Sequence, residues 1–149
     1  MIRAEVQTRI EEALKVLFAR DPVLLESDTG ERAVVAKLAC YMAPLFPNHD
    51  VDVEYNRHGL ESKTVELPRE CGGGGEKLII PDIIVHRRGV DTANLLVAEI
   101  KKETNPEPRT CDRAKILAMK KQLRYKWGVL IELPSGTGAQ YRKAREEWF

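Results

Sequence analysis

Two charged residues lie two positions apart in a segment that is otherwise mostly apolar. Glu99 and Lys101 belong to the segment NLLVAEIKK, and Asp82 belongs to the apolar segment before it, KLIIPDIIV. Successive side chains of a β-strand point to opposite faces, so Glu99 and Lys101 project from the same face. A short turn between the two segments would pair them as adjacent strands and bring Asp82 alongside. The sequence therefore predicts a cluster of charged groups on one side of a sheet.

Ionised groups in such apolar strands need a compensating partner, because burying each one costs on the order of several kcal/mol. One interpretation is a salt bridge between Lys101 and either Glu99 or Asp82 that only holds the sheet together. The other is a site for Mg²⁺, which prefers carboxylate oxygens and keeps several of its waters. In the second interpretation Lys101 stabilises negative charge on a phosphodiester under attack, or helps to deprotonate the metal-bound water.

The periodicity predicts which elements position these residues. A first amphipathic helix ends at Asp21-Pro22, and the segment 51–55 alternates as a half-exposed strand. A polar connection is expected between about Gly59 and Gly75. The other predicted elements are a helix from about Asp28 to Pro47, strands over 77–85 and 94–100, a helix over 112–127, a strand over 128–133 and a closing helix over 139–149. We expect one domain over residues 1–149, with a mixed central sheet flanked by helices in the α/β class.

The spacing of these residues resembles a known nuclease signature. Pro81-Asp82, followed after sixteen residues by Glu99-Ile100-Lys101, is similar to the motif of the PD-(D/E)XK nucleases. The predicted element order between about Glu31 and Leu133 resembles their restriction-endonuclease-like αβββαβ core. The resemblance implies hydrolysis of DNA phosphodiester bonds that depends on Mg²⁺ or Mn²⁺.

The resemblance also implies roles for individual residues. Asp82 and Glu99 would bind the metal, the carbonyl of Ile100 would add a ligand, and Lys101 would be the catalytic lysine. Glu31, near the start of the helix before the first strand, matches an acidic position found in many members. Lys115 lies on the helix after the motif, where family members often add a basic or polar residue.

Several of these residues have a second interpretation. Asp28 and Glu31 are also spaced as a capping box at a helix start. The short D…ExK pattern is also compatible with an inactive nuclease-fold module that binds nucleic acid or assembles with proteins, and with a structural α/β protein. Asp52 and Glu54 would share one face of the first strand, either as a solvent-facing row or as extra metal ligands.

Basic residues predominate between Lys101 and Lys126, which suits either a phosphate backbone or a solvated helix face. Lys115 is the contact to test first. Lys102 points to the face opposite Lys101 and is expected to be a solvated charge at the strand end, where it is a second candidate nucleic-acid contact. On the same segment, Asp112 is expected to cap the helix, and Tyr125 and Trp127 to pack in the core.

The overall composition gives further expectations. The formal net charge of +1 does not by itself indicate nucleic-acid binding. The three cysteines include no CxxC pair, which argues against a disulfide framework and a zinc site, and the three histidines are expected at the surface or in turns. Charged residues interrupt the first eighteen residues, so we expect a cytoplasmic protein without a membrane segment. A homodimer is expected if the substrate is duplex DNA.

Overall fold

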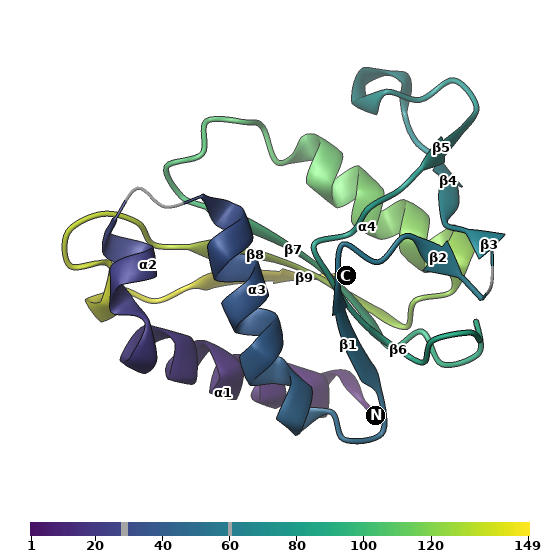
Figure 1. The fold of residues 1–149 in the computed structure, drawn as a ribbon. Helices are drawn as coiled ribbons and strands as arrows, with labels where there is room; N and C mark the ends of the chain where they lie inside the picture. The colour runs from purple at the N-terminus through teal and green to yellow at the C-terminus, as the bar shows by residue number, and fades with distance from the viewer. Residues whose placement is uncertain (28–29, 60) are drawn as a thin grey trace.

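The computed structural model describes residues 1–27, 30–59 and 61–149, and a five-stranded mixed sheet forms its centre (Figure 1). The strand order is β1-β6-β7-β8-β9, with β7 and β8 parallel and the other neighbours antiparallel. The strands are β1 (Asp50–Val53), β6 (Ile83–His86), β7 (Leu96–Lys102), β8 (Trp127–Leu133) and β9 (Arg145–Trp148). The expected α/β class, with a mixed sheet and flanking helices, is confirmed.

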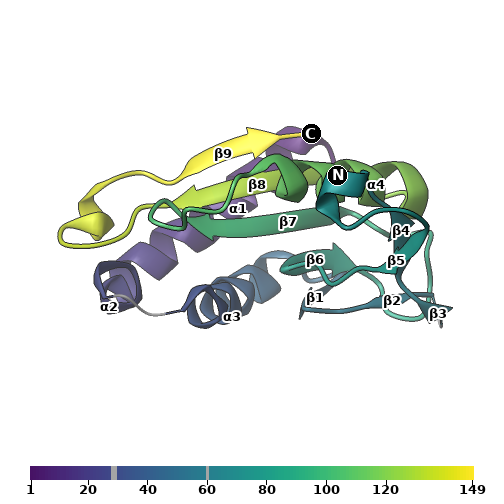
Figure 2. The ribbon, with the colours of Figure 1, turned by 90° about the horizontal axis from the view of Figure 1, so that it is seen from above.

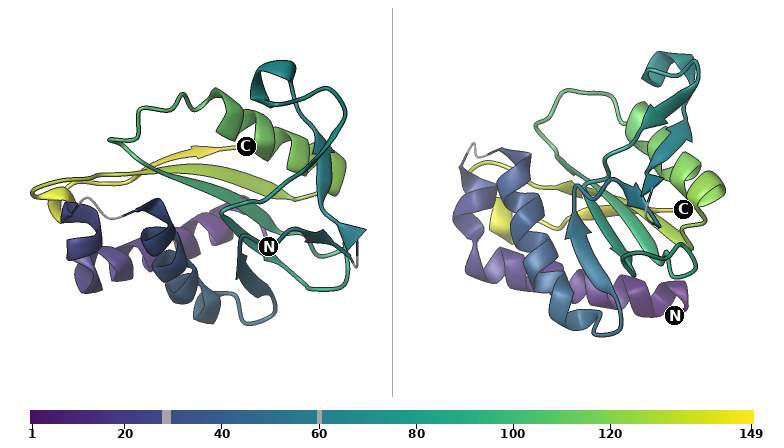
Figure 3. Two further views of the ribbon diagram at one scale, coloured as in Figure 1. Left: turned by 45° about the horizontal axis from the view of Figure 1, so that its top comes forward. Right: turned by 45° about the vertical axis from the view of Figure 1, so that its right-hand side comes forward.

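Helices cover both faces of this sheet (Figure 3). One face packs against α1 (Arg3–Arg20), α2 (Pro22–Glu26) and α3 (Glu31–Met42), and the other packs against α4 (Thr110–Leu123). A hydrophobic core lies on each face of the sheet, and alternate residues of β7 pack into one or the other. Ala98 packs on the α1–α3 side and Val97 on the α4 side. This alternation directs the odd-numbered charged residues of β7 towards α4.

The segment predicted as one strand over 77–85 is two separate strands. β5 (Glu76–Leu78) pairs with β4 (Thr64–Glu66) outside the main sheet, and β6 begins only after Asp82. Pro81 has no backbone N–H to donate, which accounts for the break. The expected polar connection contains β3 (Glu61–Ser62), β4 and the short helix η2 (Arg69–Cys71), and β2 (Arg57–His58) directly precedes it. Of these elements, β4 and η2 contact α4, and Figure 2 shows β4 beside that helix.

The predicted closing helix over 139–149 is wrong. The chain forms a short 3-10 helix, η3 (Ala139–Tyr141), and then β9, whose Trp148 pairs with Val129 of β8. The helical spacing of Tyr141, Ala144 and Trp148 was misleading, because Tyr141 is 85% exposed and pairing with β8 determines the local structure. Near the N-terminus, α2 and η1 (Ala43–Leu45) were not predicted as separate helices.

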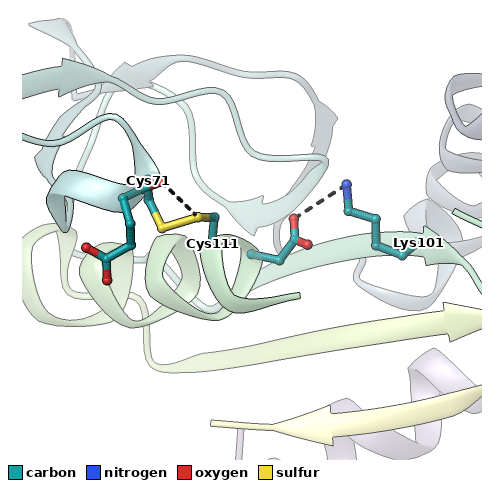
Figure 4. Close-up of a disulfide and its surroundings, with 5 residues drawn as sticks. Cys71, Lys101 and Cys111 are labelled. Carbon is teal, nitrogen blue, oxygen red and sulfur yellow. Dashed lines mark hydrogen bonds and ion pairs between the residues drawn. A yellow bond between two sulfur atoms is a disulfide. The ribbon is translucent and has the colours of Figure 1, made fainter. Parts of the chain in front are cut away.

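Two cysteines form a disulfide, although the spacing of the three cysteines argues against a disulfide framework. Cys71 at the end of η2 bonds to Cys111 in the first turn of α4, with 5.3 Å between their Cα atoms (Figure 4). The third, Cys40, is an exposed free thiol. The bond fastens the glycine-rich segment after η2 to the helix that covers the charged face of β7. Among the described residues, no helix has the length and apolar character that crossing a membrane requires.

We predict that removing this bond lowers stability. The Cys71→Ala/Cys111→Ala variant should lose about 2–4 kcal/mol of unfolding free energy, because its unfolded chain is no longer cross-linked. Urea unfolding with and without dithiothreitol measures the effect, and Cys40→Ala should keep both the stability and the dependence on reductant. Three titratable thiols in the unreduced protein, together with no effect of reductant, would contradict the bond.

Candidate functional site

The predicted charged residues lie on neighbouring segments, where β6 and β7 separate. Ile83 pairs with Ala98, so Asp82 at the entry to β6 comes opposite Glu99. The Asp82 amide lies 3.4 Å from Oε1 of Glu99, to which it donates. The structure thus brings Asp82 and Glu99 together, although Asp82 precedes its strand instead of occupying the middle of it.

Two backbone amides on the open edge of β7 find carboxylates as partners. β6 pairs with β7 only as far as Ala98, whereas β8 follows the other edge of β7 to Lys102. Beyond Ala98, the Ile100 amide donates to Oδ2 of Asp82 at 2.8 Å, and the Lys102 amide donates to Oε2 of Glu31 at 2.8 Å. Carboxylates therefore take the place of a strand partner, because an unpaired buried amide is costly.

Glu99 is buried and has a partner that sequence reasoning did not assign to it. Only 1% of the residue is exposed, and Nζ of Lys115 on α4 lies 2.8 Å from its Oε2. Lys115 also donates to the carbonyl of Ile80 at 3.1 Å. Burial raises the pKa of Glu99 to about 8, with Asp82 adding to the rise and Lys115 opposing it. The salt-bridge interpretation names Lys101 as the partner of Glu99 or Asp82, whereas in the structure the partner of Glu99 is Lys115.

Lys101 points to the same face as Glu99, as predicted, and meets other acids there. Its Nζ lies 3.3 Å from Oε2 of Glu107 and 3.6 Å from Oδ1 of Asp112, beside the disulfide at the start of α4 (Figure 4). Burial opposes its charge, but Asp112, Glu107 and Glu31 raise the pKa of Lys101 above its ordinary value. Asp112 makes no capping hydrogen bond, contrary to expectation, and pairs with Lys101 instead.

A cavity of about 350 Å³ opens beside these groups. Its lining includes Asp82, Ile100, Lys101 and Glu31, whereas the buried Glu99 does not line it. Besides the Lys102 amide, Glu31 accepts a hydrogen bond from Nδ2 of Asn105 at 2.8 Å, which holds the start of α3 against the end of β7. The capping-box interpretation involves Asp28, which lies outside the described residues, and Gly30 is the N-cap of α3.

Glu54 is a further acidic residue of this cavity, and it forms an ion pair of 3.2 Å with Arg32. It follows β1 with a φ of 53°, so it leaves the alternation that would have placed it beside Asp52. Asp52 is not part of a solvent-facing row, because its side chain is 13% exposed and bonds to His86 and Arg88. His86, expected at the surface, is buried.

Lys102 lies on the face opposite Lys101, as predicted, but it is not a solvated charge. The residue is 4% exposed, and its Nζ donates to the carbonyl of Ser27 at 3.2 Å on the α2–α3 side. Its burial contradicts the expectation of a phosphate contact there. Tyr125 and Trp127 pack against the two cores, as expected.

The oxygen atoms around Asp82 are of the kind that a hard cation prefers as ligands, but only a few carboxylates supply them. Within residues 1–27, 30–59 and 61–149, no three His, Cys, Asp or Glu side chains are grouped to hold one metal ion. Mg²⁺ needs only one or two carboxylates when water and substrate supply its other ligands, so Asp82 and Glu99 meet its chemical preference. Comparison of the chain with family models, curated proteins and solved structures found no match.

We predict that Glu99 makes stability depend on pH in the presence of a chelator. Its pKa is about 8 in the folded protein against 4.5 for an unperturbed group, so the folded form retains a proton that the unfolded chain releases. The unfolding free energy should therefore fall as pH rises between these values, by at most about 1.4 kcal/mol per pH unit. Urea unfolding at several pH values should show this fall reduced in Glu99→Gln.

The exposed Glu76 provides the control, since Glu76→Gln should keep the pH dependence of the wild type. The comparison between variants is needed because His86, whose pKa burial lowers, changes stability in the opposite direction near neutral pH. Identical slopes in Glu99→Gln and wild type would show that Glu99 stays ionised in the folded protein.

Proposed function

We propose that this protein is a Mg²⁺-dependent nuclease that hydrolyses DNA phosphodiester bonds on a restriction-endonuclease-like core of the PD-(D/E)XK type. The observation that carries the proposal is the shared cavity of Asp82, Lys101 and Glu31, with the Glu99 carboxylate accepting a hydrogen bond from the backbone amide of Asp82. Two carboxylates beside a lysine, next to an opening, provide the groups that metal-assisted phosphodiester hydrolysis requires.

Asp82 and Glu99 are the proposed metal ligands, with the carbonyl of Ile100 as a third oxygen. When bound, Mg²⁺ lowers the pKa of a coordinated water and neutralises charge on the phosphate. Oδ2 of Asp82 is held by the Ile100 amide, which fixes the carboxylate relative to β7. Glu31 is held in the same way by the Lys102 amide, and we assign it to orienting water at the cavity.

Lys101 is proposed to act through its charge. Its neighbours Asp112 and Glu107 favour the ammonium form, so its pKa lies above the ordinary value and proton abstraction from water is disfavoured. An ammonium at this position stabilises the negative charge that develops on the phosphate. Of the two roles considered for this lysine, electrostatic stabilisation is therefore the one we assign.

Lys115 is proposed to balance the charge of Glu99 whenever a metal ion is absent. Its Nζ is 2.8 Å from Glu99, and the side chain is 22% exposed, so it reaches the site from α4 while remaining accessible. If a cation compensated Glu99 instead, the Lys115 ammonium would be available to donate to a phosphate oxygen, as its candidate role as a nucleic-acid contact requires.

We predict that Asp82→Asn abolishes metal-dependent cleavage. The substitution keeps the side-chain shape and an oxygen for the Ile100 amide but removes the charge that holds the cation, so the rate should fall at least about 100-fold. Cleavage of plasmid and short duplex DNA with Mg²⁺ or Mn²⁺ measures the loss. Asp91→Asn, at an exposed site, is the matched control. Cleavage that persists in Asp82→Asn and in chelator would refute the proposal.

A second candidate function is an inactive module of the same fold, which binds nucleic acid or assembles with a protein. The ion pair between Lys115 and buried Glu99 favours it, because that pair compensates the carboxylate without any metal. The two candidates differ in whether Mg²⁺ can replace the ammonium, which an unfolding experiment can test.

We predict that Lys115→Met loses about 3–5 kcal/mol of unfolding free energy in chelator at pH 9, where Glu99 of the wild type is ionised and would keep no compensating cation. The nuclease proposal predicts that millimolar Mg²⁺ restores part of this loss, since the metal binds only the folded form. Lys121→Met, at an exposed position on the same helix, should be insensitive to both changes. No recovery, together with no heat of Mg²⁺ binding to the wild type, would favour the inactive module.

A further inference from the structure

A second cavity, of about 480 Å³, lies at the other end of β7. Its lining residues belong to the β6–β7 connection, to His49 before β1 and to the link from α4 to β8. Leu95 contributes to its lining, and Lys101 lies six residue positions further along the extended chain, a span of about 20 Å. It is therefore distinct from the cavity of Asp82.

The lining of this cavity is cationic. Arg87, Arg124 and Lys126 contribute to it together with His49 and the segment Thr92–Leu95, and no acidic residue does. Within the described parts of the chain, none of the three cations has a carboxylate within 4.0 Å. Their positive charge is therefore not neutralised locally.

The acids nearest in sequence bind elsewhere. Asp91 lies 3.5 Å from His58, and Asp50 lies 3.5 Å from Arg88. Near the first cavity the basic residues are paired, since Lys101 and Lys115 each contact a carboxylate. The cations of the second cavity are not paired in this way among the residues that the structure describes. Because the whole chain has a formal net charge of only +1, an unneutralised group of cations around one cavity is a local feature and not a consequence of composition.

A role in stabilising the fold explains the presence of only some of the basic residues around this cavity. Cations at the end of a helix are favoured by its dipole, and Arg124 directly follows α4. That effect does not account for Arg87 or His49, which come from the other side of the cavity. Burial, followed by Arg87, lowers the pKa of His49, and Arg9 and the chain's amino group act in the same direction while Asp50 opposes them. The protein thus holds like charges together around an open space, which an anionic ligand would relieve.

We propose that this cavity binds a phosphate group. Guanidinium groups match phosphate oxygens with two parallel hydrogen bonds, and Lys126 adds a point charge. Nε of Arg87 donates to the carbonyl of Asn48 at 3.1 Å, which orients the guanidinium and leaves its terminal nitrogens for a ligand. The phosphate belongs either to a small phosphorylated molecule or to a nucleic-acid backbone, and the same donors serve both.

The test is an NMR titration of the ¹⁵N-labelled protein with inorganic phosphate and, separately, with a short single-stranded oligonucleotide. EDTA and constant ionic strength keep it independent of metal binding and of cleavage. Amides of residues 49, 87–95 and 124–126 should shift on saturation. The Arg87→Gln/Arg124→Gln variant should bind at least about tenfold more weakly, because two charge-assisted contacts are lost.

The control variant is Lys37→Gln/Lys143→Gln, which removes the same charge at exposed positions away from the cavity and should bind within twofold of the wild type. Saturable binding of inorganic phosphate identifies a site for small phosphorylated molecules, and binding of the oligonucleotide alone identifies a backbone contact. Equal weakening in both variants, shifts elsewhere in the protein or no binding of either ligand would overturn the proposal. Because no metal is present, these outcomes do not depend on the proposed nuclease activity.

Discussion

The burial of Glu99 is the constraint on which the candidate site depends. A carboxylate that is 1% exposed on β7, the central strand of the sheet, requires compensation, and α4 supplies it through Lys115 at 2.8 Å. Asp82 adds a backbone amide from the opposite side. The position of α4 over β7 is therefore fixed by charge as well as by apolar packing, and the disulfide to Cys111 holds the start of the same helix.

The open edge of β7 explains why the other acids gather there. β6 stops pairing at Ala98, so the amides of Ile100 and Lys102 need acceptors, and the carboxylates of Asp82 and Glu31 provide them. A carboxylate can accept several hydrogen bonds, so one bond to an amide positions it and leaves acceptor sites towards the cavity. The same bonds can therefore serve the fold and the proposed chemistry.

Sequence periodicity correctly predicted which face of the sheet each charged side chain of β7 points to, because a strand buried on both faces alternates strictly. Glu99 and Lys101 share one face, and Lys102 points to the other. It failed where long-range contacts decide the structure. The burial of Lys102 depends on Ser27, and the partner of Glu99 lies on α4. The closing segment became β9 because the edge of β8 was available, which no local pattern reveals. The PD-(D/E)XK resemblance itself remains a prediction.

The distribution of charge also limits how the proposed hydrolysis can proceed. Because Asp112 and Glu107 keep Lys101 protonated, the acceptor for a proton from water has to be one of the acids that line the cavity. Glu31 uses both of its oxygens in hydrogen bonds, and Glu54 pairs with Arg32. Burial raises the pKa of Asp82, which makes its carboxylate more basic, but metal binding would reverse that effect. Glu31 and Glu54 are therefore the acids of the cavity that lie outside the proposed metal ligands, and one of them would have to accept the proton while keeping its present partner.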